Sequence, residues 1–475
     1  MKGDDVTRAQ WVGVGSVTPV PVAPAVRFLW RQRRTDTLEG LAWFSVAVVL
    51  ALFLADGGWT YFTNIRDIAT GAGIVAGLVG SDLLLVTLLL AARLPFIDGS
   101  IGYDRALGAH RRLGKPVLYL ILAHMVLLLV GYGLALERDP AAQAIAMFTS
   151  MPDLPQAFIA VALLTLIVAL SLVIVRHKLS YLAWYCTHLL VYAAVLLALP
   201  HQFSQGELFA VGTWARGYWL SLYIVTFASV AVFRFLIPLG RNLRHGLRVS
   251  EVRAEAPGVA SIVMTGRDLG RLEAHGGQFF NWRFWSPGLR LEAHPYSLSA
   301  APDGQSLRIT VRVLGDGSRR ILGLRPGARV FFEGPYGLFT AAARTIDRAV
   351  LIGGGIGITP IRALLDDIDV PSGALTVILR GDDPEHVYLK REIEEICGRI
   401  GARLEVLVGL PPHDGHTWLP ATVFASGQTL LTLAPDIPDV DLFVCGPKPW
   451  AELVIRDARE AGVPPHRIHA ERFDW

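Results

Sequence analysis

The sequence has few cysteines and few charged residues for its length. Three of its 475 residues are cysteines, and they lie far apart at Cys186, Cys397 and Cys445. This spacing excludes a disulfide framework, a cysteine-bound zinc site and a built-in iron–sulfur cluster, each of which needs several cysteines close together. Charged residues make up 18% of the chain and the formal net charge is +3, so we expect no nucleic-acid partner.

The apolar content is high and unevenly distributed. Hydrophobic residues make up 52% of the chain and the mean hydropathy is +0.43, which is typical of a membrane protein. Leucine, valine and alanine dominate residues 41–237, whereas residues 245–475 have the mixed composition and regular glycine and proline of a globular α/β protein. The sequence therefore predicts a membrane-embedded part followed by a soluble part.

Six segments are long and apolar enough to cross a bilayer, which takes about 20 residues in a helix. They are residues 38–55, 74–94, 112–134, 156–175, 182–199 and 216–238. Arginine and lysine gather before the first segment, in the second and fourth connections and after the sixth, and such residues mark the cytoplasmic side. We therefore expect a multi-pass protein of the cell membrane, surrounded by lipid, with both termini in the cytoplasm.

Two of these segments carry histidines at similar spacings. His110 and His124 are fourteen residues apart at the third span, and His188 and His201 are thirteen residues apart at the fifth. Each pair is thus separated by about 20 Å along the membrane normal. Fourteen residues return to the same helix face, but thirteen do not, so we expect Pro200 to kink or end the fifth helix and re-aim His201.

Four neutral imidazoles at two levels can bind two b-type haems, each iron taking one nitrogen from either side. Such six-coordinate iron is suited to electron transfer. Taken singly, each histidine has an ordinary alternative as a helix-end or polar-packing residue, but the matched spacing in two parallel spans favours ligation. His177 lies in a basic loop beside Arg176 and Lys178, and we interpret it as interfacial.

The segment HPYSLSAAP, residues 294–302, is predicted to be a strand of a small β-barrel. Tyr296 offers a flat ring and a hydroxyl to a flavin, and Ser297 and Ser299 can hydrogen-bond its isoalloxazine ring or phosphate. An aromatic-Ser-x-Ser strand alone is more often ordinary β-structure. Because EGPYGLF, residues 333–339, follows at barrel spacing, we predict an FAD site.

The segment VRVLGDGS supplies further groups for the same cofactor. Arg312 is a counter-ion for a pyrophosphate, and Gly317 and Ser318 enter a short helix whose backbone N–H groups can hold phosphate.

The segment RAVLIGGGIGITPIRALL, residues 348–365, has the order strand, glycine run and amphipathic helix. Glycines let the backbone approach a pyrophosphate at a helix N-terminus. The residues predicted to contact the nucleotide are Gly353, Gly354, Gly355 and Gly357, with Thr359 and Pro360 starting the helix.

Two later strand ends complete the predicted nucleotide site. Arg380 follows the second strand where the adenosine ribose should lie, which would favour the 2′-phosphate of NADPH over NADH; the alternative is a solvated strand-end arginine. Cys445, Gly446 and Pro447 end a later strand, at the edge where a nicotinamide would sit. A buried structural cysteine is the alternative for Cys445.

Together these motifs resemble the NADPH oxidase and ferric reductase superfamily. The residues that carry the resemblance are DRALGAH, WYCTHLL, HPYSLSAAP, VRVLGDGS, GGGIGITP and CGP. The resemblance implies a six-span transmembrane haem domain at 38–240, an FAD-binding β-barrel of the ferredoxin reductase type at 245–342 and an NAD(P)-binding α/β domain at 345–475. Residues 1–37 are then a cytoplasmic tail, which we expect to be disordered.

The resemblance also assigns roles to single residues. It implies that His110 pairs with His188 on an inner haem and His124 with His201 on an outer one. It places His294 and Pro295 at the start of the FAD motif. Cys445 lies at the hydride-transfer edge, and the terminal ERFDW resembles a flavin-shielding aromatic tail, in which Phe473 fits best and Trp475 is its rival.

The implied activity is a relay from NADPH, or alternatively NADH, through FAD and two haems to a one-electron acceptor on the outer side. In oxidase relatives a histidine one turn beyond the outer ligand and an arginine in the first span belong to the oxygen site. Here that position is Leu128 and the first span has no arginine. A ferric chelate, oxygen, a quinone or an extracytoplasmic redox protein therefore stay open as acceptors, and the sequence predicts no oligomeric state.

Other function classes also stay open. One is a haem-binding membrane subunit or sensor that serves a partner protein or a quinone. The other is a transporter or channel that uses intramembrane histidines for protons, which would leave the fused reductase motifs without a purpose.

Overall fold

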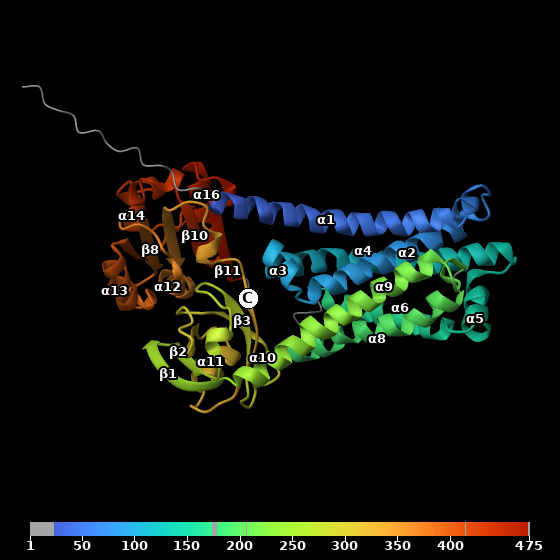
Figure 1. The fold of residues 1–475 in the computed structure, drawn as a ribbon, viewed down its shortest axis with the longest axis horizontal. Helices are drawn as coiled ribbons and strands as arrows, with labels where there is room; N and C mark the ends of the chain where they lie inside the picture. The colour runs from blue at the N-terminus through green and yellow to red at the C-terminus, as the bar shows by residue number, and fades with distance from the viewer. Residues whose placement is uncertain (1–22, 173–177, 206, 414, 474–475) are drawn as a thin grey trace, which may run out of the picture.

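A computed structural model describes residues 23–172, 178–205, 207–413 and 415–473. It consists of an elongated bundle of long helices and a soluble module of strands and short helices at one end of the bundle (Figure 1). The sequence-based division into a membrane part and an α/β part corresponds to these two parts.

The bundle contains six helices that are long and apolar enough to cross a membrane, counted over the described residues. Its helices are α1 (Ala23–Ala55), α2 (Ile68–Ala91), α3 (Pro95–Ile101), α4 (Tyr103–Ala135), α5 (Pro140–Ser150), α6 (Leu154–Ser171), α8 (Tyr181–Gln205), α9 (Trp214–Ser229), the π-helical η3 (Val230–Leu236) and α10 (Ile237–His245). The six predicted spans all fall within these helices, apart from their last or first few residues.

Two boundaries differ from the prediction. Helix α1 begins at Ala23, so residues 23–37 are helical and not a disordered tail; residues 1–22 lie outside the described part of the chain. Helix α4 begins at Tyr103, nine residues before the predicted span, so His110 is inside the helix and not at its edge. Hydropathy marks the lipid-buried length of a helix and not its ends. Because basic residues lie near the starts of α1 and α4, the first turns of these helices were not predicted.

Helices α2 and α4 approach each other through glycines. A Cβ atom at Gly73 or Gly80 would lie 3.0 Å from Leu128 Cδ2 or Ile121 Cδ1, and a Cβ atom at Gly77 would overlap the imidazole of His124. Small residues on one face of a transmembrane helix allow this close backbone approach. The backbone of α2 therefore lies directly against the side chains of α4.

Helix α1 joins the bundle through a polar contact. Ser45 Oγ donates a hydrogen bond to Asp82 Oδ1 on α2 at 2.6 Å and lies 2.9 Å from Tyr218 Oη on α9. Asp82 is buried. In a membrane, a buried carboxyl holds together the helices whose side chains hydrogen-bond to it.

The first domain of the soluble module has two three-stranded antiparallel sheets. One has the order β1 (Arg248–Ala256), β2 (Val259–Thr265), β5 (Ser306–Arg312), and the other β4 (His294–Ser297), β3 (Phe279–Phe284), β6 (Val330–Tyr336). The bridges Arg248–Arg329 and Leu298–Ile309 link them. This pairing defines two sheets and does not by itself close the predicted barrel.

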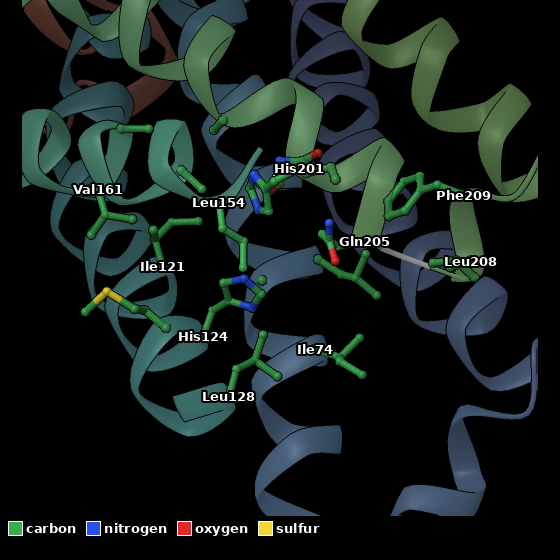
Figure 2. Close-up of a pocket in the computed structure, with 18 of the residues that line it drawn as sticks. Ile74, Ile121, His124, Leu128, Leu154, Val161, His201, Gln205, Leu208 and Phe209 are labelled. Carbon is green, nitrogen blue, oxygen red and sulfur yellow. Dashed lines mark hydrogen bonds between the residues drawn. The ribbon is translucent and has the colours of Figure 1, made fainter. Parts of the chain in front are cut away.

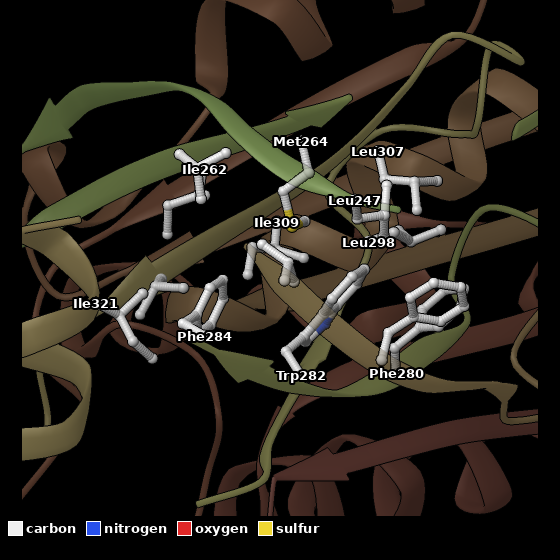
Figure 3. Packing of buried hydrophobic residues seen from close by; sticks show 14 of the residues in the cluster. Leu247, Ile262, Met264, Phe280, Trp282, Phe284, Leu298, Leu307, Ile309 and Ile321 are labelled. Atoms are coloured by element: carbon white, nitrogen blue, oxygen red, sulfur yellow. The ribbon is translucent and has the colours of Figure 1, made fainter. Parts of the chain in front are cut away.

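Large apolar side chains fill the space between these sheets (Figure 3). Trp282, Phe280 and Phe284 from β3 pack against Ile262 and Met264 from β2 and are fully buried. Along β3 and β6, side chains that point into this core alternate with side chains that point toward the bundle. The same two strands therefore build the core and contact the bundle.

The second domain has a parallel five-stranded sheet in the order β11 (Ile468–Phe473), β10 (Asp441–Pro447), β7 (Ala349–Gly354), β8 (Leu375–Gly381), β9 (Arg403–Val408). Its main helices are α12 (Ile358–Asp367), α13 (Lys390–Ile400) and α16 (Lys448–Glu460), with short α14 (Ala421–Ala425) and α15 (Leu430–Leu433). β7 is the first strand of the chain in this sheet, and later strands add on both of its sides. A ligand crevice is expected at the carboxyl ends of β7 and β10, where the strand order reverses.

The bundle and the soluble module meet at β6. Asn242 on α10 pairs with Phe332 in both directions: its Nδ2 donates to the Phe332 carbonyl and its Oδ1 accepts from the Phe332 N–H, each at 2.8 Å. Arg241 Nη1 donates to the Gly334 carbonyl at 2.6 Å. The last membrane helix is thus fixed to a strand edge by bonds like those between strands.

A half-buried carboxylate strengthens the same junction. Glu333 on β6 pairs with Arg93 from the end of α2, with Arg283 on β3 and with Arg234 on η3, the last at 3.4 Å. Tyr336 on β6 accepts a hydrogen bond from Arg93 at 2.9 Å. One carboxylate of the soluble module therefore binds cations of two membrane helices.

A second carboxylate joins the two soluble domains. Glu392 on α13 accepts from Arg308 on β5 at 2.9 and 2.8 Å, from Arg362 on α12 at 2.8 Å and from Arg253 on β1 at 3.1 Å. Partial burial raises the pKa of Glu392, but the hydrogen bonds from Arg308 and Arg362 outweigh it and lower the pKa to about 2.

We expect Glu392→Gln to lower the thermal stability of the soluble module by a few degrees at pH 7, corresponding to about 1–2 kcal/mol for a partly exposed network. The folded pKa lies below the unfolded value of about 4.3, so the stabilisation is present above that value and is lost as pH falls toward 2. Thermal unfolding of the full chain in detergent should show the difference from wild type shrinking between pH 5 and 3.

The control is Glu394→Gln on the same helix, whose exposed carboxylate pairs with Lys390 at 3.5 Å. It should change the midpoint very little. Equal effects of the two variants at pH 7 would contradict a joining role for Glu392.

Candidate functional site

The four histidines predicted as ligands form two facing pairs inside the bundle. The ring centres of His110 and His188 are 6.0 Å apart, and those of His124 and His201 are 6.5 Å apart. In each pair α4 supplies one ring and α8 the other. The structure thus brings the histidines together in the combination that the resemblance implied.

Hydrogen bonds at the Nδ1 atoms orient these rings. His110 Nδ1 lies 2.9 Å from the Thr87 carbonyl and His124 Nδ1 lies 2.8 Å from the Gly73 carbonyl. A carbonyl can only accept, so each Nδ1 carries a proton, and Nε2 is the nitrogen that remains to bind a metal. Metal-binding histidines typically donate the N–H of their other ring nitrogen in this way.

The rings on α8 have different surroundings. His188 Nδ1 lies 3.3 Å from Ser171 Oγ, which also accepts from Trp184 Nε1 at 3.2 Å, and the Trp184 ring stacks on His188 with centres 5.2 Å apart. His201 Nδ1 is buried and makes no hydrogen bond of good geometry with the described residues, although the Ala198 carbonyl lies close by.

Pro200 does not end the helix. Helix α8 continues through it to Gln205, and His201 nevertheless lies opposite His124. Of the two predicted effects of this proline, ending the helix is therefore wrong.

The spacing of the rings fits a metal ion between them. An imidazole nitrogen binds a metal at about 2.0–2.1 Å and lies roughly 1.1 Å from its ring centre, so two rings on opposite sides of one metal have centres about 6.3 Å apart. The observed 6.0 and 6.5 Å lie on either side of this value. The Nε2 atoms that remain on the α4 rings and this distance fit bis-histidine haems.

A cavity of about 510 Å³ surrounds the pair farther from the soluble module. Figure 2 shows His124 and His201 in this cavity, with Ile121, Leu128 and Leu154 around them. Its wall is mostly apolar and includes Gly77, the residue at which a side chain would overlap His124. Such a lining would suit a flat hydrophobic cofactor held by His124 and His201.

Hydrogen bonds link polar residues of this wall to each other. Tyr223 Oη donates to Gln202 Oε1 at 2.7 Å, and Gln202 Nε2 lies 3.4 Å from Ser81 Oγ. Within the described residues, the polar groups of Tyr223, Gln202 and Ser81 therefore find hydrogen-bond partners in this wall and do not face lipid.

The predicted flavin residues lie on β4 and at the start of α11 (Asp316–Leu322). His294 Nε2 is buried and has no hydrogen-bond partner in the described part of the chain, and a Cβ atom at Gly317 would come within 3.0 Å of its ring. Burial, and then Arg283, lower the pKa of His294 to about 4, so its imidazole is neutral. An orphaned buried nitrogen beside a glycine fits a bound cofactor at this place.

Neighbouring β4 residues contribute shape rather than charge. Pro295 pairs with Asn281 and Tyr296 with Phe280 on β3. The Tyr296 ring lies nearly parallel to His294 with centres 6.4 Å apart, and burial raises the pKa of Tyr296 to about 12. Its hydroxyl is therefore a neutral donor.

The structure uses two of the predicted serines internally. Ser299 Oγ accepts from Arg308 Nε at 3.2 Å, and Ser318 Oγ accepts from the Leu314 N–H at 2.8 Å. Ser297 is buried on β4, and Arg312 is exposed at the end of β5. Arg312 and the backbone at the start of α11 are thus more accessible to a phosphate than Ser299.

The glycine loop has the predicted strand, turn and helix. β7 ends at Gly353 and Gly354, the 3₁₀ turn η6 spans Gly355–Gly357, and α12 begins at Ile358. A Cβ atom at Gly357 would overlap the Cys445 carbonyl. Glycine is therefore required here for the loop to pack on the end of β10.

The first residues of α12 and the end of β10 frame this loop. Thr359 Oγ1 donates to the Ile356 carbonyl at 2.9 Å, and Thr359 and Pro360 are buried. At the end of β10, Gly446 is covered by the ring of Trp450, and Pro447 is exposed.

Cys445 and the C-terminal strand lie at the expected nicotinamide edge. Cys445 is fully buried in the core, and burial raises the pKa of its thiol. It pairs with Gly353 on β7 and Glu471 on β11. The backbone of Phe473 pairs with Pro447; the side chain of Phe473 and all of Trp475 lie outside the described residues.

Glu471 was not identified from the sequence. Burial, and then the nearby Asp104 of α4, raise its pKa to about 8, so it carries a proton at neutral pH. The sequence offered one signal for this residue, namely an acidic side chain two positions before the aromatic Phe473. Its neighbour Asp104 lies on α4, which is distant in sequence, so the pattern alone does not predict the surroundings of Glu471.

Arg380 does not lie free at its strand end. It is 4% exposed, its Nη1 pairs with Asp382 Oδ1 at 3.2 Å and its Nε donates to the Trp418 carbonyl at 3.3 Å. Its guanidinium is therefore occupied by protein groups, unlike the free cation that the sequence suggested.

Comparisons with known proteins match both parts of the chain. Residues 76–199 match the family described as ferric reductase like transmembrane component, and this range contains His110, His124 and His188. The chain is 29% identical over 238 residues to ferredoxin–NADP reductase B of Sorangium cellulosum, covering 48% of this chain and 96% of that protein.

Two further similarities are of the same kind. The chain is 30% identical over 246 residues to the ferredoxin reductase component of 3-ketosteroid-9-alpha-monooxygenase of Mycolicibacterium smegmatis, covering 50% of this chain and 67% of that protein. Among solved structures, the flavohaem-like FAD/NAD-binding domain of nitric oxide dioxygenase from Vibrio cholerae O1 biovar El Tor is 22% identical, with a TM-score of 0.39, and covers 48% of this chain and 99% of that chain.

We expect Gly357→Ala to destabilise the nucleotide domain by about 1–3 kcal/mol, because the added methyl group pushes the loop away from the Cys445 carbonyl. Gly398→Ala is the control, since a Cβ atom at this exposed helical position meets nothing within 4 Å, and there alanine should be neutral or stabilising. Thermal unfolding of both variants measures the difference. A Gly357→Ala protein as stable as Gly398→Ala would show that the loop does not need glycine.

Proposed function

Because this chain joins a ferric-reductase-like transmembrane domain to a ferredoxin–NADP reductase-type FAD/NAD-binding module, as in the NADPH oxidase and ferric reductase superfamily, we propose that it carries electrons from NAD(P)H across a membrane through FAD and two bis-histidine haems. The observation that carries the proposal is the pair of facing histidine rings at each of two levels. A transporter using single protonatable histidines would need neither this ring spacing nor a flavin module.

When bound, FAD would supply hydride acceptance and haem iron would supply one-electron transfer. The chain's own residues hold and orient them. His110 and His188 would hold the haem near the module, and His124 and His201 the other. The carbonyls of Thr87 and Gly73 keep the α4 rings in the ligating tautomer.

The two histidine pairs lie at different depths of the membrane. Gly73 and Thr87, the residues whose carbonyls orient the rings, are fourteen residues apart on α2, which is about 21 Å in a helix. This is a large part of a hydrocarbon core of about 30 Å. Two levels at this separation suit passage of electrons from one side to the other.

Aromatic rings join the flavin domain to the start of the helix that carries His110. Tyr103, at the start of α4, stacks on Tyr336 of β6 with centres 4.9 Å apart, and Phe279 packs against both rings. These ring contacts hold β6 against the helix that carries His110.

We propose that the module lies in the cytoplasm of a cell-membrane protein, on the strength of the lysine and arginine distribution. The acceptor then reaches His124 and His201 from the opposite side. In the outer cavity Leu128 lies where oxidase relatives have a histidine, so we favour a ferric chelate over oxygen; a quinone or a redox protein partner are the other outcomes of the test.

The decisive experiment is the visible spectrum of the purified protein in detergent, before and after anaerobic NAD(P)H. Flavin and low-spin haem bands that are reduced by the nucleotide, followed by faster reoxidation with ferric chelate than with air or quinone, would support the proposal. Absence of haem, or haem that NAD(P)H cannot reduce with FAD present, would overturn it.

We expect His124→Leu and His188→Leu each to lower the haem content from about two to about one per chain, since each breaks a different pair. Haem would be counted by extraction against protein mass. His413→Leu, a variant of an exposed histidine in a soluble loop, should keep both haems.

We expect Gly77→Leu to lose the same haem as His124→Leu while both His124 and His201 remain, because the new side chain occupies the space of the His124 ring. Gly217→Leu on α9, where a Cβ atom meets nothing within 4 Å, is its control. Full haem content in Gly77→Leu would contradict the close packing of α2 on α4.

A further inference from the structure

We propose that the nucleotide site selects NADH and discriminates against NADPH, with Asp382 as the residue that determines this specificity. The inference rests on the proposed function, since it names the electron donor of the same site. It reverses the expectation from the sequence, in which Arg380 favoured NADPH.

The location follows from the register of the sheet. β8 lies beside β7, and Arg380 is paired with Gly354, the second glycine of the loop. In sheets of this kind the adenosine ribose lies past the carboxyl end of the neighbouring strand, where an acidic residue binds the 2′-hydroxyl of NAD or an arginine accommodates the 2′-phosphate of NADP. β8 ends at Gly381, so the next residue, Asp382, occupies this place.

Arg380 cannot easily serve as the phosphate-binding group. Its side chain is 5% exposed, whereas that of Asp382 is 59% exposed. Asp382 and the Trp418 carbonyl already bind the guanidinium, and Trp450 Nε1 donates to the same carbonyl at 3.3 Å. Moving Arg380 out would break these contacts and leave the Trp418 carbonyl with fewer donors.

The exposed groups at this edge are acidic. Asp382 presents a carboxylate, which accepts hydrogen bonds from ribose hydroxyls and repels a phosphate dianion. Asp383 is held by His386, whose N–H and Nδ1 lie 3.0 and 2.8 Å from its two oxygens, so its carboxylate is fixed at the same edge. Rejection by an unfavourable charge is a common way to separate two similar ligands.

A cation of the flavin domain acts on the same edge. Burial raises the pKa of the Tyr388 hydroxyl, the charge of Arg312 lowers it, and the charges of Asp383 and Asp382 raise it. We expect Arg312 to be engaged by the FAD pyrophosphate, which leaves Asp382 as the exposed charge beside the ribose.

The test compares NADH and NADPH as anaerobic reductants of the full-length holoprotein. We expect kcat/KM for NADH to exceed that for NADPH by about tenfold or more. Asp382→Ser should raise kcat/KM for NADPH by about tenfold, because it removes the repulsive carboxylate, while NADH loses a hydrogen bond. Asp382→Asn keeps the size of the side chain and should shift the ratio in the same direction.

The control is Asp436→Ser, whose exposed carboxylate pairs with Arg348 at 2.7 Å in the same domain; it should leave the ratio unchanged. Equal or better use of NADPH by wild type, or an unchanged ratio in both Asp382 variants, would overturn the inference.

Calorimetric binding of 5′-AMP and 2′,5′-ADP gives a readout that needs no electron transfer. Wild type should bind 5′-AMP more tightly, and Asp382→Ser should reverse or abolish this order; tighter binding of 2′,5′-ADP by wild type would overturn the inference. If neither NADH nor NADPH reduces the protein, the proposed function fails, and the order of these two fragments still decides the question of specificity.

Discussion

The close approach of α2 to α4 is the constraint on which the rest of the membrane part depends. A helix already uses its backbone carbonyls in its own hydrogen bonds, so a histidine can share one only if its ring reaches the backbone surface. Gly73 and Gly77 provide this access for His124. A larger residue at Gly77 would displace the ring, and with it the spacing to His201 that fits a haem iron.

The same device appears at both junctions of the soluble module: one carboxylate binds arginines from several elements. Glu333 gathers Arg93 and Arg234 from the bundle and Arg283 from its own sheet, and Glu392 gathers arginines of both soluble domains. A carboxylate with several guanidinium partners fixes direction as well as distance, because each bond is geometrically specific. The flavin domain is thus held in position on two sides.

Much of this arrangement could be predicted from local patterns. The six spans, the glycine loop between β7 and α12 and the strand at His294 are local features, and the structure has all of them. The histidine spacing predicted two levels, although the role of the four rings stays a prediction. The path of α8 through Pro200 could not be predicted, because a proline in a membrane helix can kink it, end it or leave it continuous, depending on its neighbours.

Features that depend on distant contacts were missed. Arg380 looked like a free cation because sequence shows the strand end but not the Trp418 carbonyl, which comes from a loop 38 residues later. Glu333 begins the EGPYGLF segment but had no role assigned to it, and Glu392 and Glu471 lie in no motif, because part of the surroundings of each comes from another domain. The predicted barrel stays a prediction, because the alternation of residues within strands does not determine whether two sheets close into one.

The bonds between Asn242 and Phe332 have a mechanical consequence. Trp214 to His245 form one continuous helical rod of 32 residues, about 48 Å long, so a tilt of roughly 5° moves its end by about 4 Å. Since the end of the rod is bonded to β6, the flavin domain must follow that movement or strain the junction. A change in bilayer thickness that alters the tilt of this helix would therefore change the distance between the flavin domain and the helices that carry the histidines.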